Sequence, residues 1–171
     1  GRAKSWTWAY YLFDRPTTAT NPLGHYAETL YDTSSNVTEA KRWEEAGTPD
    51  VLLAHTKQSF DETGRMYKVE RGLKGTSTWS FLATTLYFDE RNLVTLVVDP
   101  RAKETSFGYD AAGRRNLVED ALGNQVATTY DANGNPTLIA ETESTGYATA
   151  KTFSTEMDYD ELDRLDEKRV V

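Results

Sequence analysis

Apolar and polar residues alternate along short segments of this chain, and each segment ends at a group of turn-forming residues. Stepping back by two from Tyr109 gives Phe107 and Thr105, whereas the intervening positions hold Gly108 and Ser106. A period of two is typical of a β-strand with one apolar and one polar face. The same alternation leads back from three other aromatic residues: Phe88, Tyr130 and Tyr159. Successive turns lie about six or seven residues apart, a spacing that suits strands and is too short for ordinary helices.

An aromatic residue followed by aspartate ends many of these segments. The pair occurs seven times, whereas the numbers of Phe, Tyr and Asp in the chain predict about one occurrence by chance. The seven copies are Phe13-Asp14, Tyr31-Asp32, Phe60-Asp61, Phe88-Asp89, Tyr109-Asp110, Tyr130-Asp131 and Tyr159-Asp160. Their spacing indicates a repeat of about 21 residues that is lengthened by about eight residues in some copies.

Each aspartate of these pairs begins a predicted tight turn. Its carboxylate can accept a hydrogen bond from the backbone two residues later, and the residue three positions after it needs a positive φ. Glycine, or an Asn or Asp that tolerates the left-handed region, fills that position in five copies: Gly64, Asn92, Gly113, Gly134 and Asp163. Ser35 and Thr17 fit it less well. The first copy, at Asp14, is therefore interpreted as a degenerate or terminal unit.

A second turn lies about halfway through the repeat, at residues 21–24, 99–102 and 120–123. Two turns per unit make each repeat a two-stranded hairpin. The sequence therefore predicts an all-β fold, an antiparallel meander of tandem hairpin repeats that forms a curved sheet of about a dozen strands. Residues 1–12 are interpreted as a leading strand of a truncated repeat, and residues 13–171 as one repeat domain from a larger protein.

Three segments depart from this regular pattern. Residues 38–47 contain good helix formers and end in glycine, so a short helix competes with the strand that the repeat register favours, and both alternatives stay open. Residues 71–79 and 141–150 are rich in Gly, Ser and Thr, which predicts loops inside lengthened hairpins.

The composition narrows the possible functions. The 171 residues include no cysteine, which excludes disulfides, thiol nucleophiles and thiolate metal sites. A net charge of −8 argues against nucleic acid as a partner, because nucleic-acid binders concentrate positive charge. No apolar run approaches the length of a membrane span. The numerous Thr, Val and aromatic residues suit a pleated surface.

The motifs together resemble the YD-repeat, or RHS-repeat, family. The residues that carry the likeness are Tyr-Asp-Ala-Ala-Gly-Arg at 109–114, which includes Arg114, Tyr-Asp-Ala-Asn-Gly-Asn at 130–135, Phe-Asp-Glu-Thr-Gly-Arg at 60–65 and Asp-Ala-Leu-Gly at 120–123. The family includes bacterial RHS toxins, the shell subunits of Tc toxins and the teneurins. The resemblance implies that this chain is a segment of a spiral β-shell in a secreted or surface protein. Its implied partners are the neighbouring repeats and an enclosed C-terminal toxin domain.

The chain lacks the core-associated segment that follows the repeats in toxin-releasing members of that family. The self-cleavage role of an aspartate in that segment is therefore not transferred to Asp110 or Asp131, which belong to ordinary repeat turns. His25 and His55 are interpreted as solvated or edge residues, and no Gly-x-Ser-x-Gly motif is present. We assign no residue to catalysis, to a cofactor or to a metal, and predict that this chain is not an enzyme.

An alternative function is recognition of a carbohydrate or a cell-surface partner through aromatic side chains. Trp6, Trp8, Tyr10 and Tyr11 cluster near the start of the sequence, and Trp43 and Trp79 are placed in irregular segments. Packing of Trp6 and Trp8 on a neighbouring hairpin is favoured over such contact. Exposed sheet edges also predict self-association of this chain.

Overall fold

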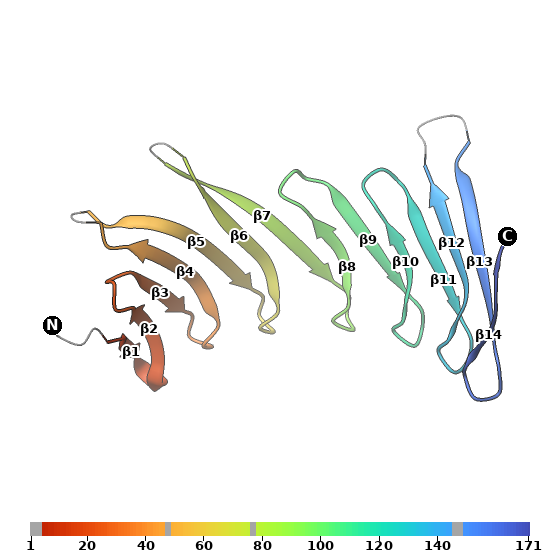
Figure 1. The fold of residues 1–171 in the computed structure, drawn as a ribbon, viewed down its shortest axis with the longest axis horizontal. Helices are drawn as coiled ribbons and strands as arrows, with labels where there is room; N and C mark the ends of the chain where they lie inside the picture. The colour runs from red at the N-terminus through yellow and green to blue at the C-terminus, as the bar shows by residue number, and fades with distance from the viewer. Residues whose placement is uncertain (1–4, 47–48, 76–77, 145–148) are drawn as a thin grey trace. The chain divides into compact units, whose positions relative to one another are not determined.

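A computed structural model describes residues 5–46, 49–75, 78–144 and 149–171. These residues form fourteen strands and one short 3-10 turn (Figure 1). The chain divides into two compact units, Gly1–Thr85 and Leu86–Val171, which we describe separately. No helix formed by the described residues is long and apolar enough to cross a membrane.

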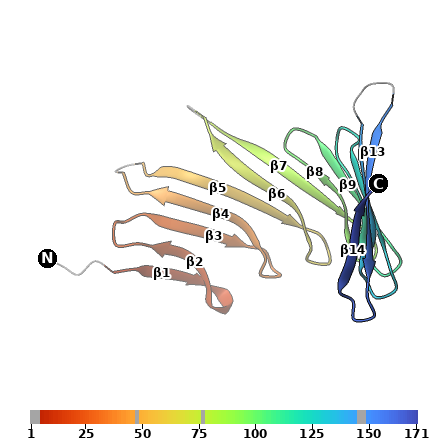
Figure 2. The same cartoon turned by 45° about the vertical axis from the view of Figure 1, so that its right-hand side comes forward.

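The first unit is an antiparallel meander in which each strand pairs with the preceding one (Figure 2). Its elements are β1 (Thr7–Tyr11), the 3-10 turn η1 (Leu12–Asp14), β2 (Arg15–Thr20), β3 (Tyr26–Tyr31), β4 (Val37–Glu44), β5 (Val51–Phe60), β6 (Met66–Lys74) and most of β7 (Trp79–Phe88).

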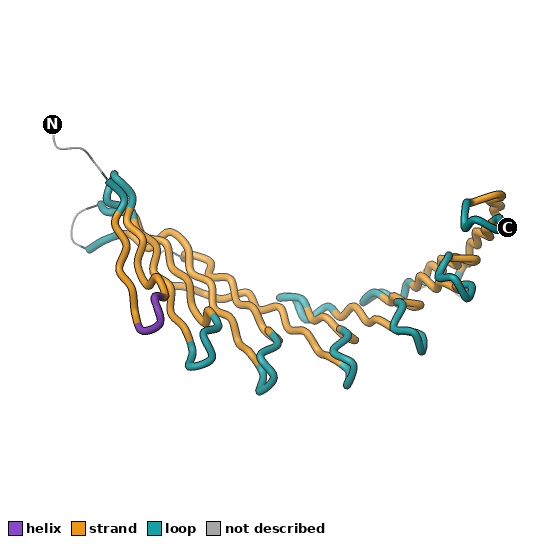
Figure 3. The backbone as a smooth tube through the Cα atoms, turned by 90° about the horizontal axis from the view of Figure 1, so that it is seen from below, coloured by secondary structure: helices purple, strands orange, loops and turns teal. Residues whose placement is uncertain are grey.

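The second unit repeats the same arrangement with shorter connections. Its strands are β8 (Val94–Val98), β9 (Glu104–Tyr109), β10 (Arg115–Glu119), β11 (Gln125–Tyr130), β12 (Pro136–Glu143), β13 (Lys151–Tyr159) and β14 (Leu165–Val170). Each of them pairs antiparallel with its neighbour in sequence. Loops join the strands only at their ends (Figure 3). The predicted all-β meander of hairpins is confirmed.

Three local predictions are corrected by the strand pairing. The segment that begins at residue 38 is strand β4 and not a helix, because Trp43 pairs with Tyr26 on one side and Leu52 on the other. Residues 71–74, expected in a loop, extend β6, and residues 141–143 extend β12. Trp43 and Trp79 thus lie in strands. In each case a hydrogen-bonded neighbour outweighs local propensity.

The first aromatic-aspartate pair does not form the expected turn. Phe13 has φ 65° and Asp14 has φ 54°, and the Phe13 side chain is 85% exposed, so this aromatic ring does not end a strand. Arg15 precedes Pro16, which disfavours the helical conformation that the second turn position requires. Arg15 is extended instead, with φ −80° and ψ 121°. The strand therefore resumes at once, after the 3-10 turn at Leu12–Asp14.

Within each unit the sheet is a layer with two accessible faces. Met157, at 8% exposure, is the one buried apolar side chain among the described residues. In the second unit Phe107 lies across from Val118, which lies across from Val126, so the aromatic face is continuous over three strands. The opposite face is less polar than predicted, because Leu117 lies there beside Ala127. Stability therefore depends on contacts between neighbouring strands more than on a closed core.

Candidate functional site

The turn at Asp110 shows how one side chain organises a hairpin. The Asp110 backbone N–H donates to the Arg114 carbonyl at 2.9 Å, and the Gly113 N–H donates to the Asp110 carbonyl at 3.0 Å. The carboxylate Oδ1 accepts from the N–H groups of Ala112 and Arg114, each at 2.9 Å. The aspartate side chain therefore pairs with donors that the strands leave unused.

The same backbone hydrogen bonds recur in both classes of turn that the sequence distinguishes. The described residues show them at Asn21, Asp32, Asp61, Asp89, Asp99, Asp110, Asp120, Asp131 and Asp160. The turns that follow aromatic residues and those halfway through the repeat thus share one geometry. Because turns without a preceding aromatic residue close in the same way, the aromatic residue is not needed to close the turn.

The fourth position of each of these turns has a positive φ. The residues are Gly24, Ser35, Gly64, Asn92, Ala102, Gly113, Gly123, Gly134 and Asp163. Ser35, which fits this position poorly by residue type, nevertheless has φ 73°, and Ala102 has φ 57°. The hydrogen bonds of the turn impose the left-handed conformation on both residues, at a cost in strain.

A basic or amide side chain four residues after many of these aspartates binds the second carboxylate oxygen. Arg114 Nε donates to Asp110 Oδ2 at 2.7 Å, and Asn124 Nδ2 donates to Asp120 Oδ2 at 2.8 Å. Hydrogen bonds from the Arg114 backbone and guanidinium lower the pKa of Asp110 below its ordinary value. The Asn124 side chain is the main cause of a lowered pKa at Asp120.

Acid should unfold this protein through its turns. The pKa of an unfolded aspartate is about 3.9. Folding lowers the pKa of eight turn aspartates: Asp32, Asp61, Asp89, Asp99, Asp110, Asp120, Asp131 and Asp160. The stability that ionised aspartates contribute is present above the unfolded value and is lost as pH falls through the folded values. Melting temperatures measured between neutral pH and about pH 2 should fall steeply below about pH 4. A melting temperature that stays constant over this range would contradict the prediction, and Asp110→Asn should make the fall shallower.

Arg114 also connects its own turn to the next turn that follows an aromatic residue. Its Nη1 donates to the Asp131 carbonyl at 2.9 Å, and its guanidinium lies 4.7 Å from the centre of the Tyr130 ring. In the opposite direction, the Tyr130 hydroxyl donates to the Arg115 carbonyl at 2.8 Å. The turns at Asp110 and Asp131 are thus joined by bonds that run both ways.

The turns that follow aromatic residues lie at the same end of the strands within each unit (Figure 1), and similar links join other pairs of them. Arg15 Nη1 donates to the Asp32 carbonyl at 3.2 Å, and Arg91 Nη1 donates to the Asp110 carbonyl at 2.9 Å. Three more tyrosine hydroxyls donate to a carbonyl of an earlier hairpin: Tyr31 to Pro16, Tyr109 to Val94 and Tyr159 to Pro136. We call these arginine and tyrosine links the turn ladder. Phe60 and Phe88 have no hydroxyl to contribute.

A comparison with known protein families finds a match for part of the sequence that forms this ladder. The family model "RHS Repeat" matches residues 88–125, which hold the turns at Asp89, Asp99, Asp110 and Asp120. The resemblance to RHS repeats is confirmed. The match supports a structural role for the sheet. A search of curated protein sequences gave no match.

Solved structures similar to this chain come from Tc toxins. The crystal structures of TcdB2-TccC3-TEV and TcdB2-TccC3-Cdc42 each give a TM-score of 0.45, at 14% and 15% sequence identity, over 96% and 92% of this chain. The Photorhabdus luminescens Tc holotoxin pore gives a TM-score of 0.40 at 12% identity over 96% of this chain. This chain spans only 11% of the length of each of these three matched chains.

Removing a hydroxyl from the turn ladder should cost stability without altering the fold. Tyr130→Phe deletes the bond to the Arg115 carbonyl and keeps the ring beside Arg114, so we expect a loss of about 1 kcal/mol in unfolding free energy. Chemical denaturation measures the loss. Tyr87→Phe is the matched control, because Tyr87 is 51% exposed and its hydroxyl bonds to no described residue. Equal losses in the two variants would contradict the role of the ladder.

The two histidines are less solvated than predicted. His55 Nε2 pairs with Glu39 Oε1, and its ring packs edge-on against Phe81 with centroids 4.9 Å apart. His25 Nδ1 is buried without a hydrogen-bond partner in the described part of the chain. The described residues contain no group of three or more His, Asp or Glu side chains arranged to hold a metal.

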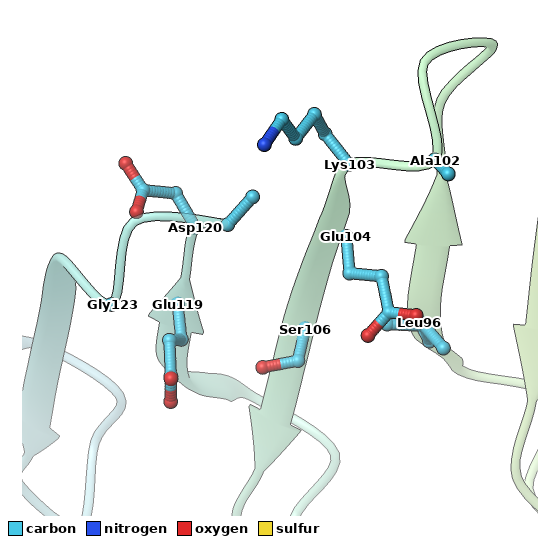
Figure 4. Close-up of a pocket in the computed structure, with 9 residues that line it drawn as sticks. Leu96, Ala102, Lys103, Glu104, Ser106, Glu119, Asp120 and Gly123 are labelled. Carbon is cyan, nitrogen blue, oxygen red and sulfur yellow. The ribbon is translucent and has the colours of Figure 1, made fainter.

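A polar pocket of about 360 Å³ lies between the turns at Asp99 and Asp120 in the RHS-repeat region (Figure 4). Glu104, Ser106 and Glu119 line it from neighbouring strands, and Lys103 lies at its edge. Glu119 already accepts a hydrogen bond from Gln125 Nε2 at 3.0 Å. Because the lining includes no histidine to activate Ser106, the pocket lacks a Ser-His pair for nucleophilic chemistry.

Proposed function

We propose that this chain is part of the wall of a β-shell, and that the full-length protein uses the shell to enclose a polypeptide cargo. The turn ladder is the observation that supports this proposal. Arg114 joins the turn at Asp110 to the Asp131 carbonyl seventeen residues away. Such bonds hold successive hairpins together at their ends, where backbone pairing stops.

The physical properties of the sheet suit a wall. Strands hydrogen-bonded over their whole length leave no opening for a protein chain, since neighbouring strands lie only about 5 Å apart. Each repeat offers its side chains to the next, so stability accumulates along the array. A wall also needs two usable faces, one toward the cargo and one toward solvent, and both faces are accessible in each unit.

The proposal assigns this chain a steric role and no catalytic one. Its partners are the adjoining repeats and a toxin domain as cargo, in a secreted or surface-displayed protein. Residues 13–171 then form one repeat domain that residues 1–12 lead into. Outside its parent protein, the chain is expected to self-associate through unpaired strand edges.

Protection of the cargo from protease tests the proposal. The full-length protein that contains this sequence is digested, and the lifetime of the polypeptide C-terminal to the repeats is compared with that of the same polypeptide alone. Enclosure predicts a much longer lifetime in the full-length protein, and a shorter one when Arg114→Ala weakens the wall. Equal lifetimes for the free and attached polypeptide would rule enclosure out. Image reconstruction of the same sample should show density inside the shell.

A further inference from the structure

A row of small side chains crosses the first unit on one face of the sheet. The register pairs Trp8 with Ala19, Ala19 with Ala27, Ala27 with Arg42, and Arg42 with Ala54. Residues directly across from each other in adjacent strands lie on the same face. Because three of these five residues are alanines, the row forms a shallow groove between the tryptophan and the arginine.

Tryptophans form one wall of this groove. Trp6 and Trp8 project from the same face, two residues apart, with ring centroids 6.3 Å apart and planes 20° from parallel. Trp6 and Trp8 are 54% and 55% exposed, so a large part of each indole stays accessible to a ligand. Trp43, by contrast, donates its indole N–H to Glu28 at 2.8 Å. The indole N–H groups of Trp6 and Trp8 have no such partner among the described residues.

Unpaired polar groups form the other wall. A cavity of about 240 Å³ extends from Trp6 over the alanine floor to Arg42 and Glu44, with His25 at its margin. The side chains of Arg42 and Glu44 form no hydrogen bond or ion pair with any residue that the structure describes. The Nδ1 atom of His25 is buried and unpartnered within the same part of the chain. An unpaired buried polar atom costs free energy unless a ligand or water satisfies it.

We propose that this groove binds a neutral sugar, with one pyranose ring of a glycan stacked against Trp6. A pyranose has an apolar C–H face that suits an indole and a rim of hydroxyl groups. Those hydroxyls both donate and accept, so they can satisfy the Glu44 carboxylate and the Arg42 guanidinium together. The cavity is smaller than the roughly 300 Å³ that begins the range for drug-sized ligands, which suits one sugar ring.

The charge pattern argues for a neutral ligand over a charged one. An anion would be attracted by Arg42 and repelled by Glu44, whereas a cation would be attracted by Glu44 and repelled by Arg42. Grooves lined by exposed aromatic residues also bind proline-rich peptides, which are therefore the alternative ligand. The backbone of such a peptide offers carbonyl acceptors but few donors, so it leaves Glu44 unpaired in a desolvated site. The sugar is therefore the better fit to both walls.

Titration of the 171-residue chain with cellohexaose, chitohexaose and maltohexaose tests the proposal. Calorimetry and the NMR signals of the tryptophan indole groups report binding. We expect saturable binding of at least one of the three glycans, with shifts at Trp6 and Trp8. Saturable binding of none of them would overturn the proposal, as would tighter binding of a decaproline peptide than of any glycan.

Variants locate the site and separate binding from folding. Trp6→Ala removes the stacking surface, and Ala27→Val fills the floor while keeping a residue that suits a strand. Each should weaken glycan binding by about tenfold or more, which corresponds to about 1.4 kcal/mol. Tyr10→Ala is the control, because Tyr10 is a 60% exposed aromatic residue on β1, four positions after Trp6, and does not line the groove.

The circular dichroism spectrum of each variant is compared with that of the parent chain. If Trp6→Ala disturbs the fold, Arg42→Gln serves in its place, since that side chain is exposed and unpaired among the described residues. Binding that survives Ala27→Val and either wall variant would place the ligand elsewhere and overturn the proposal. The result is independent of whether the shell encloses cargo.

Discussion

Gly113→Val should lower the unfolding free energy by about 1–3 kcal/mol, the range for a side chain held in a disfavoured backbone conformation. Gly113 has φ +80°, and a branched side chain is strongly disfavoured there. A Cβ at Gly113 would meet only the Leu93 Cδ1 atom at 3.8 Å, an ordinary contact. The expected loss therefore comes from backbone strain and not from a clash. Urea denaturation measures it.

Ala102→Gly is the matched control for Gly113→Val. Ala102 occupies the equivalent turn position with φ 57°. Glycine removes the left-handed strain of about 1–2 kcal/mol, and this gain exceeds the added flexibility of the unfolded chain, which costs about 0.5–1 kcal/mol. The variant should be as stable as the parent or more stable. A neutral Gly113→Val, or an Ala102→Gly that destabilises the chain, would show that turn strain does not control this fold.

Arg114→Ala should destabilise the chain by about 1–2 kcal/mol. The variant loses the hydrogen bond to the Asp131 carbonyl, worth about 1 kcal/mol, and the contact with the Tyr130 ring, worth about 0.5–1 kcal/mol. We add nothing for the ion pair with Asp110, because a third of the Arg114 side chain is exposed. Thermal and chemical denaturation both measure the loss.

Arg164 provides the control that separates the link between turns from the local ion pair. Arg164 binds Asp160 at 2.7 Å as Arg114 binds Asp110, yet it bonds to no second turn among the described residues. Arg164→Ala should therefore cost clearly less than Arg114→Ala. Arg114→Lys should behave like Arg114→Ala, because an ammonium lacks the planar fork that reaches both turns. Equal costs for Arg114→Ala and Arg164→Ala would exclude a stabilising ladder.

A double-mutant cycle of Arg114→Ala and Tyr130→Phe distinguishes a network from separate contacts. The two side chains touch, and each bonds to a different hairpin. Residues in one hydrogen-bonded network usually show a coupling energy of at least about 0.5 kcal/mol. Strict additivity would mean that the two links act independently, and the ladder would then be a set of isolated bonds.

The parts of the fold that could be predicted from the sequence are those that depend on interactions between residues close together in the chain. The aspartate of each turn bonds to groups two and four residues later, so its partners lie within the motif itself, as at Asp110 and Arg114. Strand alternation is equally local. The failures at residues 38–47, 71–79 and 141–150 arose where a neighbouring strand decided the outcome. The helix formers around Trp43 became strand β4 because Tyr26 and Leu52 pair with that residue.

The amino-acid sequence by itself determined most of the turns and strands and their order, because turn and strand preferences depend on residues a few positions apart. Only the tertiary structure decided which turn Arg114 reaches, that Trp6 and Trp8 are exposed, and that Ala19, Ala27 and Arg42 share a groove. Those features depend on the register between strands. A shift of one residue would move every side chain of a strand to the opposite face, so no short motif can specify them.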